Sequence, residues 1–175
     1  MKIAIVYTST GGTTRECAHL LARELERHDV TVADIDENID ISSYDLLVLG
    51  FPIRMGGAAK RARRYMADMA DKLSGMRVGY FMCCGFVDCF DDYKEKAIPK
   101  SLRDAAFEIS CFGGSLDPAR FRGLDKLVVR SVRSEILGGG ENGEGREDMS
   151  LPTIMDENIA QFADRIKKIS EEFTW

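Results

Sequence analysis

Four hydroxyl side chains surround a pair of glycines near the amino terminus, where an apolar run gives way to a segment with helical periodicity. These positions are Ser9, Thr10, Gly11, Gly12, Thr13 and Thr14. The first turn of a helix presents unpaired N–H groups and a partial positive charge, to which the hydroxyls add neutral donors. The glycines allow the backbone to curl closely around a tetrahedral anion. The segment therefore predicts a phosphate-binding loop without a lysine; a simple helix cap, which needs only one hydroxyl, is the alternative.

Other kinds of phosphate loop are excluded by the same segment. IVYTSTGGTTRECA contains neither G-x-x-x-x-G-K-[ST] nor G-x-G-x-x-G, which argues against the common triphosphatase and dinucleotide sites. Cys17 and Arg23 have the spacing of a cysteine phosphatase loop, but both lie inside the predicted helix, where such a loop cannot form.

The hydroxyl-rich loop needs a strand before it and a helix after it, and the rest of the chain repeats this alternation. Apolar runs predict strands at residues 2–7, 30–35, 44–50, 77–84 and 108–113. Helical patterns predict helices at residues 14–28, 58–73, 91–107 and 155–172, with Pro99 ending or kinking the third.

Strands that are apolar on both faces and alternate with helices indicate a parallel sheet covered on both sides, which is a doubly wound α/β fold. Ligands of such sheets bind beyond the carboxyl ends of the strands. The loops after the first, third and fourth strands should therefore carry the function.

Length and composition place the chain among ordinary globular proteins. Its 175 residues suit one domain, residues 1–175, and 45% hydrophobic with 30% charged residues excludes a disordered or collagen-like chain. The longest apolar run, Leu46 to Ile53, is far shorter than the ~20 residues that span a bilayer. Five cysteines without C-x-x-C spacing, and no visible secretory signal, predict a cytoplasmic protein.

Residues 116–150 exceed what a five-stranded unit requires and are predicted to be an insertion after the fifth strand. Its first part, Leu116 to Ile136, has an amphipathic helical pattern with an apolar face made by Phe121, Leu124, Leu127, Val128 and Val132. Its second part, Gly138 to Met149, contains five glycines and several acids, a composition typical of a loop.

The first loop resembles the phosphate loop of the flavodoxins. The matching positions are Tyr7, Ser9, Gly12, Thr14 and Ala18, and the resemblance extends over all five predicted strands. It implies a flavodoxin-like sheet of order 2-1-3-4-5 and bound FMN, with the phosphate on the loop from Ser9 to Thr14. The loops Phe51 to Gly57 and Gly85 to Phe90 would flank the flavin ring. The cofactor contacts implied there are Phe51, Pro52, Ile53, Arg54, Met55, Gly56, Gly85, Phe86, Val87 and Asp88.

Within this family the chain is similar to the short flavodoxin-type proteins typified by menaquinone-dependent protoporphyrinogen oxidase. The similar stretches are LGFPIRMGGAAKRARRYM, SLDPARFRGLDKLVVRSVRS and GGGE. The resemblance implies an FMN-dependent oxidoreductase or electron-transfer protein. The alternatives are a quinone-dependent protoporphyrinogen IX oxidase of heme biosynthesis and, from a different class, an FMN-free flavodoxin-like binding module.

Arg54 is the candidate for tuning the flavin. Ordinary flavodoxins, as the resemblance implies, surround FMN with acids, whereas the segment from Phe51 to Met55 offers an apolar wall and one cation. A cation near the ring would favour the reduced, anionic flavin by Coulomb attraction. The alternatives are that Arg54 points into water or pairs with an acid such as Asp88.

Other side chains near the predicted ring have both a functional and a structural interpretation. Phe51, Phe86 and Phe90 could stack on the flavin or pack in the core. Cys84 and Cys89 could exchange electrons with it or act as small apolar residues. No metal site is predicted, because the two histidines both belong to the first helix, away from these cysteines.

Charge is segregated along the chain, whose net charge is −5. Two segments, Arg54 to Arg64 and Asp117 to Arg133, each contain five cations, against no acid in the first and two in the second. If both face one entrance, they would attract an anionic small-molecule substrate, an acidic redox partner protein, or an anionic inner-membrane surface where quinone resides. Solvated helix faces are the alternative; nucleic acid is not predicted, and the oligomeric state is left open.

Overall fold

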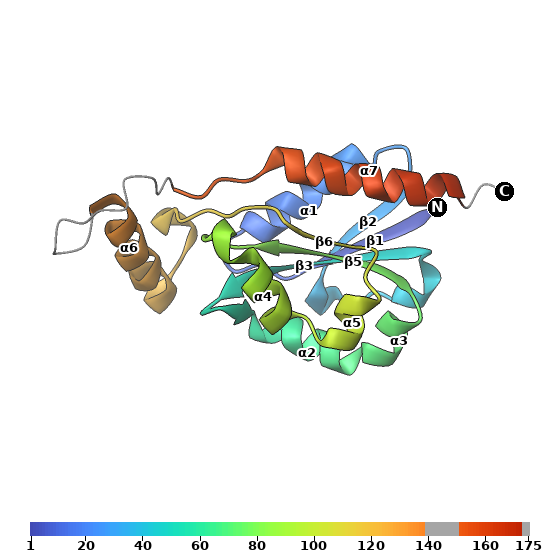
Figure 1. Ribbon diagram of the computed structural model, residues 1–175, viewed down its shortest axis with the longest axis horizontal. Helices are drawn as coiled ribbons and strands as arrows, with labels where there is room; N and C mark the ends of the chain where they lie inside the picture. Colours follow the sequence, from blue (N-terminus) through green and yellow to red (C-terminus); the bar gives the residue numbers. More distant parts are fainter. Residues whose placement is uncertain (139–150, 173–175) are drawn as a thin grey trace.

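The computed structural model describes residues 1–138 and 151–172. Five parallel strands form the centre of the protein in the order β2-β1-β3-β5-β6, and the short β4 pairs antiparallel with β3 (Figure 1). The strands are β1 (Lys2–Tyr7), β2 (Asp29–Asp34), β3 (Leu46–Arg54), β4 (Gly57–Ala58), β5 (Arg77–Cys83) and β6 (Glu108–Cys111). This confirms the predicted sheet of order 2-1-3-4-5, counted over the parallel strands.

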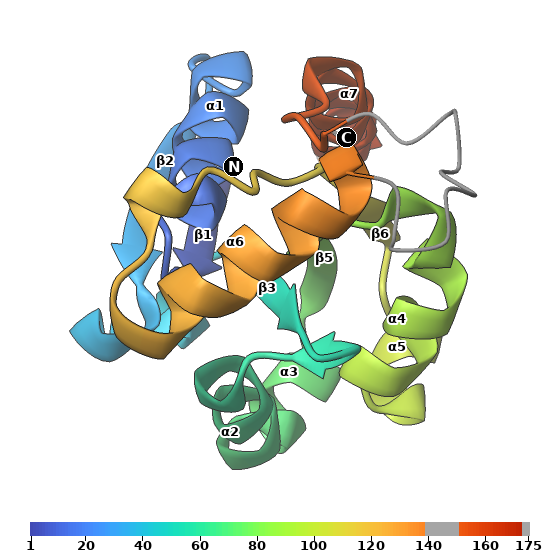
Figure 2. The ribbon, with the colours of Figure 1, turned by 90° about the vertical axis from the view of Figure 1, so that its left-hand side faces the viewer.

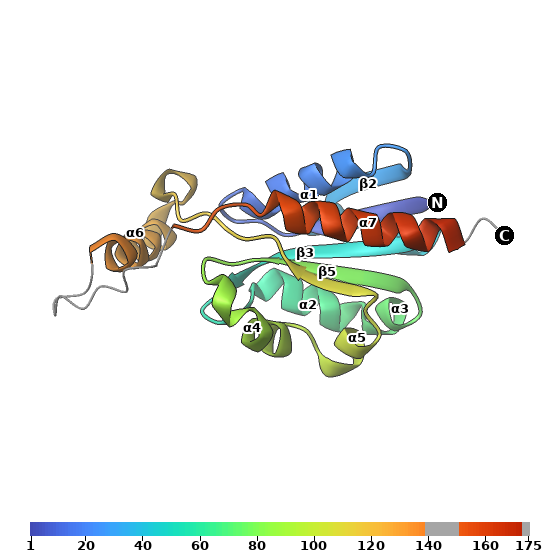
Figure 3. The ribbon, with the colours of Figure 1, turned by 45° about the horizontal axis from the view of Figure 1, so that its top comes forward.

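Helices cover both faces of the sheet, as its apolar strands require. One face carries α1 (Thr13–Glu24) and α7 (Asp156–Glu172); the other carries α2 (Lys60–Asp68), α3 (Ala70–Ser74), α4 (Phe90–Ala97) and α5 (Lys100–Asp104) (Figures 1 and 3). Short 3₁₀ turns lie at η1 (Ile35–Glu37), η2 (Ile41–Ser43), η3 (Val87–Cys89) and η4 (Pro118–Arg120).

Alternating side chains of each strand supply two separate cores. Ile3 and Ile5 of β1 pack in a cluster with residues of α1 and α7, while Ala4 and Val6 pack in a second cluster with residues of α2 to α5. All four side chains are almost completely buried. The predicted apolar face of the last helix is confirmed, because Ile159, Phe162, Ala163, Ile166 and Ile169 are buried.

Two predicted helices are each divided into two. The segment 58–73 becomes α2 and α3, which meet at Met69, where the backbone leaves helical geometry. The segment 91–107 becomes α4 and α5, divided at Ile98 and Pro99. The second break follows from proline, which disfavours helical geometry in the residue before it.

The insertion crosses the carboxyl ends of the strands. After η4 it forms α6 (Gly123–Gly138), which lies beyond the sheet's edge in Figure 1 and passes in front of the strand ends in Figure 2. A helix here is as predicted, but Leu124, Leu127 and Val128 are 80%, 60% and 59% exposed, so much of its apolar face is not packed on a core. Phe121 precedes the helix rather than forming part of it. Most of the predicted glycine-rich loop, residues 139–149, lies outside the described residues.

Among the described residues, no helix combines the length and apolarity needed to cross a membrane.

Candidate functional site

The loop between β1 and α1 has the tight curvature that its glycines allow. Gly12, with φ of 84°, is in the left-handed region that favours glycine, and its carbonyl accepts the first helical hydrogen bond from the Glu16 N–H at 2.9 Å. On the other side of the loop, the Thr8 N–H donates to the carbonyl of Gly50 in β3 at 3.0 Å. The loop is thus fixed at both ends, with the amino terminus of α1 open toward the carboxyl edge of the sheet.

The hydroxyls of this loop are not used as an ordinary helix cap. No side chain caps α1, and within the described part of the chain the buried Ser9 Oγ and Thr13 Oγ1 atoms have no hydrogen-bond partner. A buried polar group without a partner costs about 1–3 kcal/mol, so each such group calls for an explanation, and a bound ion or water is one. Two unpaired hydroxyls beside a helix amino terminus are suited to an anion that accepts hydrogen bonds.

Cationic side chains adjoin the outer side of this loop. A surface hollow of about 540 Å³ is lined by Gly11 and Gly12 together with Arg15 and Arg23, and by Arg120 and Glu16, which pair with each other. The charges of Arg15 and Arg23 add to the partial positive charge of the helix terminus and favour an anionic ligand at this edge.

Arg54 reaches this edge from the end of β3. Its Nη1 lies 3.4 Å from Thr10 Oγ1 and donates to Asp125 Oδ2 of α6 at 3.1 Å, while its Nη2 pairs with Asp125 Oδ1 at 2.8 Å. The acid that Arg54 contacts is therefore Asp125 of the insertion and not the suggested Asp88. With side chains about one-third and two-fifths exposed, the pair is partly screened by solvent.

The insertion makes two further contacts with the loop and α1. The Arg120 guanidinium pairs with Glu16 of α1 at 2.7 Å. The ring of Phe121 lies so close to Gly11 that a Cβ there would be 2.6 Å from the ring Cζ. Gly11 is thus needed for close approach of an aromatic ring, whereas Gly12 is needed for its backbone conformation.

The segment Phe51–Gly57 was predicted to be a loop, but most of it forms a hairpin. Strand β3 continues to Arg54 and turns at Met55 and Gly56, whose φ values are 49° and 77°, into β4. A two-residue turn with positive φ at both positions matches the twist of antiparallel strands. Phe51 is fully buried in the core, so its side chain is not available for stacking, whereas Met55 at the tip of the turn is fully exposed.

The second predicted ring-flanking loop follows β5. Gly85 packs against Leu116, since a Cβ at Gly85 would lie 3.5 Å from Leu116 Cδ2. Phe86 is 36% exposed, and η3 carries Val87 and Asp88. Phe90 begins α4 and packs against the core instead of belonging to the loop. Of the three aromatic candidates, Phe86 alone has both a loop position and an exposed ring.

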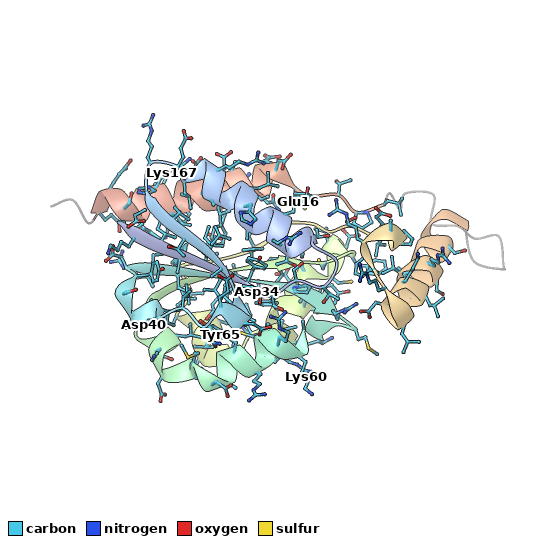
Figure 4. All side chains as sticks on the ribbon, turned by 180° about the vertical axis from the view of Figure 1, so that it is seen from behind. Glu16, Asp34, Asp40, Lys60, Tyr65 and Lys167 are labelled. Carbon is cyan, nitrogen blue, oxygen red and sulfur yellow. The ribbon has the colours of Figure 1, made fainter. Side chains whose placement is uncertain are left out.

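The two basic segments meet at Arg54 and Asp125, and the other cations of the first segment lie in two different places. Arg61 pairs with Asp34, the last residue of β2, and with Asp36 just beyond it. Figure 4 shows Asp34 at this strand end and Lys60 pointing away from the sheet. Arg63 lines a separate surface cavity of about 290 Å³ between α2 and the α4–α5 junction. The cations from Lys60 to Arg64 are therefore divided between a partly exposed ion-pair cluster with Asp34 and Asp36 and another face of the protein.

Comparison with known proteins agrees with this geometry. The family model of the flavodoxin domain matches residues 4–142, which begin within β1 and include β2 to β6, the hydroxyl-rich loop and α6. The chain belongs to the flavodoxin domain family.

This flavodoxin domain also has a full-length relative. It is 24% identical to the protoporphyrinogen IX dehydrogenase [quinone] of Escherichia coli strain K12, over an alignment of 188 positions that covers 99% of each chain. The alignment includes the insertion of this chain.

Solved structures of flavodoxins share the architecture. A short-chain flavodoxin associated with a non-canonical PDU bacterial microcompartment gives a TM-score of 0.54 at 15% identity, covering 97% of this chain and 98% of that one. A flavoprotein in complex with FMN from Lactobacillus acidophilus gives a TM-score of 0.50 at 18% identity, covering 63% and 92%. At these identities the likeness establishes the fold.

Some residues of this flavodoxin domain's site were not predicted from the sequence. Asp125, Glu16 and Cys111 contact Arg54, Arg120 and Cys84, respectively. Each contact joins residues distant in the chain. In the sequence, the opposite charges of the first two pairs were the one indication that these residues could be in contact. Within the described residues no cluster of metal-ligating side chains is found.

Proposed function

We propose that this flavodoxin domain binds FMN and acts as an oxidoreductase or electron-transfer protein. The observation that carries the proposal is the pair of buried, unpartnered hydroxyls of Ser9 and Thr13 on the tightly curled loop before α1. Family members bind FMN, as in the Lactobacillus acidophilus flavoprotein complex. FMN, when bound, would supply the electron chemistry.

The residues present are suited to hold the phosphate of FMN. Ser9, Thr10, Thr13 and Thr14 would donate from their hydroxyls, and the backbone N–H groups of Gly11 and Gly12 would add donors at the helix terminus. The β3–β4 hairpin at Pro52 to Gly56 and the loop at Gly85 to Asp88 would flank the ring. Phe86 is the candidate to cover one ring face.

Arg54 and the insertion would set the electrostatics of this site. Arg54 holds a positive charge beside Thr10, and its ion pair with Asp125 partly neutralises that charge. The unpaired positive charge of a free Arg54 would favour a reduced, anionic cofactor or an anionic substrate more strongly than the pair does. The insertion therefore controls how much of that charge the site experiences.

Titration of FMN-free protein with FMN, followed by calorimetry or flavin fluorescence, tests the phosphate-loop assignment. Hydrogen bonds to a charged group contribute about 1.5–3 kcal/mol each, so Ser9→Ala and Thr13→Val should each weaken binding by about 10- to 100-fold. Ser74→Ala is the matched control, because Ser74 caps α3 through the carbonyl of Ala70, away from the loop. Unchanged affinity in both loop variants would contradict the assignment. Failure of the unsubstituted protein to bind FMN would favour the FMN-free binding module.

A second candidate function is quinone-dependent oxidation of protoporphyrinogen. It is favoured by the full-length similarity to the Escherichia coli enzyme and by an insertion that lies over the same edge as the phosphate loop. Anaerobic protein with FMN, protoporphyrinogen and a menaquinone analogue should then form porphyrin only when all components are present. Absence of porphyrin, with rapid reduction by a flavodoxin reductase, would favour an electron carrier instead.

The partner of such an enzyme would be a quinone, and an anionic membrane surface would be the place to meet it. The exposed Leu124, Leu127 and Val128 of α6 suit peripheral contact with that surface better than solvent.

A further inference from the structure

Two cysteine side chains meet where β5 and β6 end. Cys84 Sγ and Cys111 Sγ are 3.3 Å apart, and the two residues are only 4% and 3% exposed. A disulfide requires 2.03–2.05 Å, so the sulfurs need to approach by about 1.3 Å, within reach of small side-chain rotations.

The backbone around this pair is held close by the sheet. Cys111 is the register partner of Met82 in the β5–β6 ladder, two residues before Cys84. Beyond the ladder, the Cys84 N–H donates to the Gly113 carbonyl at 2.9 Å. A Cβ at Gly114 would lie 2.3 Å from the Cys84 carbonyl oxygen, so the two segments approach as closely as glycine permits.

The hydrogen bonds and the pKa values of the two thiols differ, so that one thiol is expected to react before the other. Cys111 Sγ accepts a hydrogen bond from the Gly113 N–H at 3.4 Å. The Cys84 thiol, together with that N–H, lowers the pKa of Cys111 to about 7. Hydrogen bonding to Cys111 and burial raise the pKa of Cys84 well above its usual value. Cys111 Sγ thus accepts a hydrogen bond from an N–H group, whereas Cys84 Sγ lies 3.6 Å from the Phe86 carbonyl, which can accept its proton. This geometry favours the thiolate on Cys111.

We propose that Cys84 and Cys111 form a reversible disulfide on exposure to a hydroperoxide. The Cys111 thiolate attacks the peroxide, forming a sulfur–oxygen bond as the O–O bond breaks and an alcohol, or water from hydrogen peroxide, leaves after protonation. The Cys84 thiol then attacks the sulfenic sulfur, forming the S–S bond and releasing water. Two electrons pass from the two sulfurs to the hydroperoxide. A small dithiol restores both thiols by exchange.

This disulfide would act on the loop that follows Cys84. Gly85 packs on Leu116 of the segment after β6, so the bond would tie together two segments that already touch. That this loop flanks a flavin belongs to the proposed function; formation of the bond does not depend on it.

A second cysteine pair in the same protein provides an internal comparison. Cys17 Sγ and Cys83 Sγ are 3.7 Å apart, and Cys17 is completely buried. Hydrogen bonding to Cys17, with burial, raises the pKa of Cys83, so Cys83 is not expected to form a thiolate near neutral pH. It should stay reduced under conditions that oxidise Cys84 and Cys111.

The test uses FMN-free, full-length Cys89→Ser protein, which lacks the exposed thiol. After treatment with hydrogen peroxide, free thiols are alkylated in denaturant and tryptic peptides are analysed without reduction. Trypsin places Cys111 in residues 104–120, Cys83 and Cys84 together in residues 78–94, and Cys17 in residues 16–23. The expected product is 78–94 joined to 104–120, lost on addition of dithiothreitol.

Two further variants identify the sulfurs. The product should persist in Cys83→Ser and disappear in Cys84→Ser, and its formation rate should rise with pH as the Cys111 thiol loses its proton. The proposal is overturned if folded Cys89→Ser protein gives no such product at a peroxide concentration that oxidises Cys89 in the unsubstituted chain. It is overturned equally if the product persists without Cys84, or if 16–23 joined to 78–94 forms as fast. Because the linkage is read without flavin, its failure is distinguishable from failure to bind FMN.

Discussion

Replacing Gly11 and Gly12 by alanine, one at a time, should destabilise the protein through two different mechanisms, although the residues are adjacent. A Cβ at Gly12 meets nothing within 4 Å, but its φ of 84° is unfavourable for alanine. A Cβ at Gly11 instead lies 2.6 and 2.8 Å from Cζ and Cε1 of Phe121. The first cost is conformational and local, and the second depends on a ring 110 residues away in the sequence.

The magnitudes follow from these two causes. Left-handed geometry costs alanine about 1–2 kcal/mol, offset by about 0.4–1 kcal/mol of lost unfolded-state entropy, so Gly12→Ala should lower the free energy of unfolding by about 1 kcal/mol. Gly11→Ala must displace the half-buried Phe121 ring, with a loss of about 1–2 kcal/mol of packing. In a Phe121→Ala background that clash disappears, so Gly11→Ala should there be neutral or slightly stabilising.

Double-mutant cycles in urea unfolding of FMN-free protein measure the difference. We expect a coupling energy of about 1 kcal/mol or more between Gly11→Ala and Phe121→Ala, and additivity within about 0.5 kcal/mol for Gly12→Ala and Phe121→Ala. Tm should fall by about 2–4 °C for each kcal/mol lost from the free energy of unfolding, as expected for a chain of this size. Additive effects for Gly11 and Phe121 would show that the insertion does not pack on the loop in solution.

Two other substitutions probe the core and the pH dependence. Gly50→Ala should lower the free energy of unfolding by about 3 kcal/mol or more, because a Cβ there would lie 2.0 Å from Cζ of Phe81, which stacks on Phe112. Gly57→Ala is the control, because a Cβ at Gly57 meets nothing within 4 Å. Equal stability of the two variants in urea unfolding would contradict the packing at Gly50. Burial and, to a smaller extent, the positive amino terminus lower the pKa of His28 below 6.5. As the pH falls below about 6.5, His28 is therefore protonated in the unfolded chain before it is protonated in the folded one, and the free energy of unfolding decreases. His28→Gln should therefore lose less stability between pH 7 and pH 5, and an unchanged slope in unfolding measurements would refute this.

The fold was predictable because its signals are local. Each buried strand is a short apolar run, and each run is followed by a helical pattern or a turn. The hydroxyl-rich loop was predictable for the same reason, since Ser9 to Thr14 form one continuous segment. The strand order could be expected from the resemblance of that segment to the flavodoxins.

The contacts that complete the site were not predictable in this way. Asp125 is 71 residues from Arg54, and nothing in the sequence distinguishes it from Asp88 as a partner. The extension of β3 to Arg54 was missed because Pro52 and Gly56 read as a loop, although positive φ at Met55 and Gly56 permits a hairpin.

The contacts between the insertion and the rest of the domain are strong enough to position the insertion but too weak to hold it there in every molecule. Its two ion pairs with the rest of the domain, Arg120–Glu16 and Arg54–Asp125, have side chains about one-third to one-half exposed, so each contributes at most about 1 kcal/mol and is weakened by salt. Packing of Phe121 on Gly11 adds about 1 kcal/mol. A total of about 1–3 kcal/mol leaves roughly 0.6–16% of molecules with the insertion detached, without any unfolding of the sheet. Because these contacts involve the hydroxyl-rich loop itself, an anion bound there would compete with them or reinforce them. The affinity for that anion should consequently depend on Phe121 and Asp125 even where neither touches it.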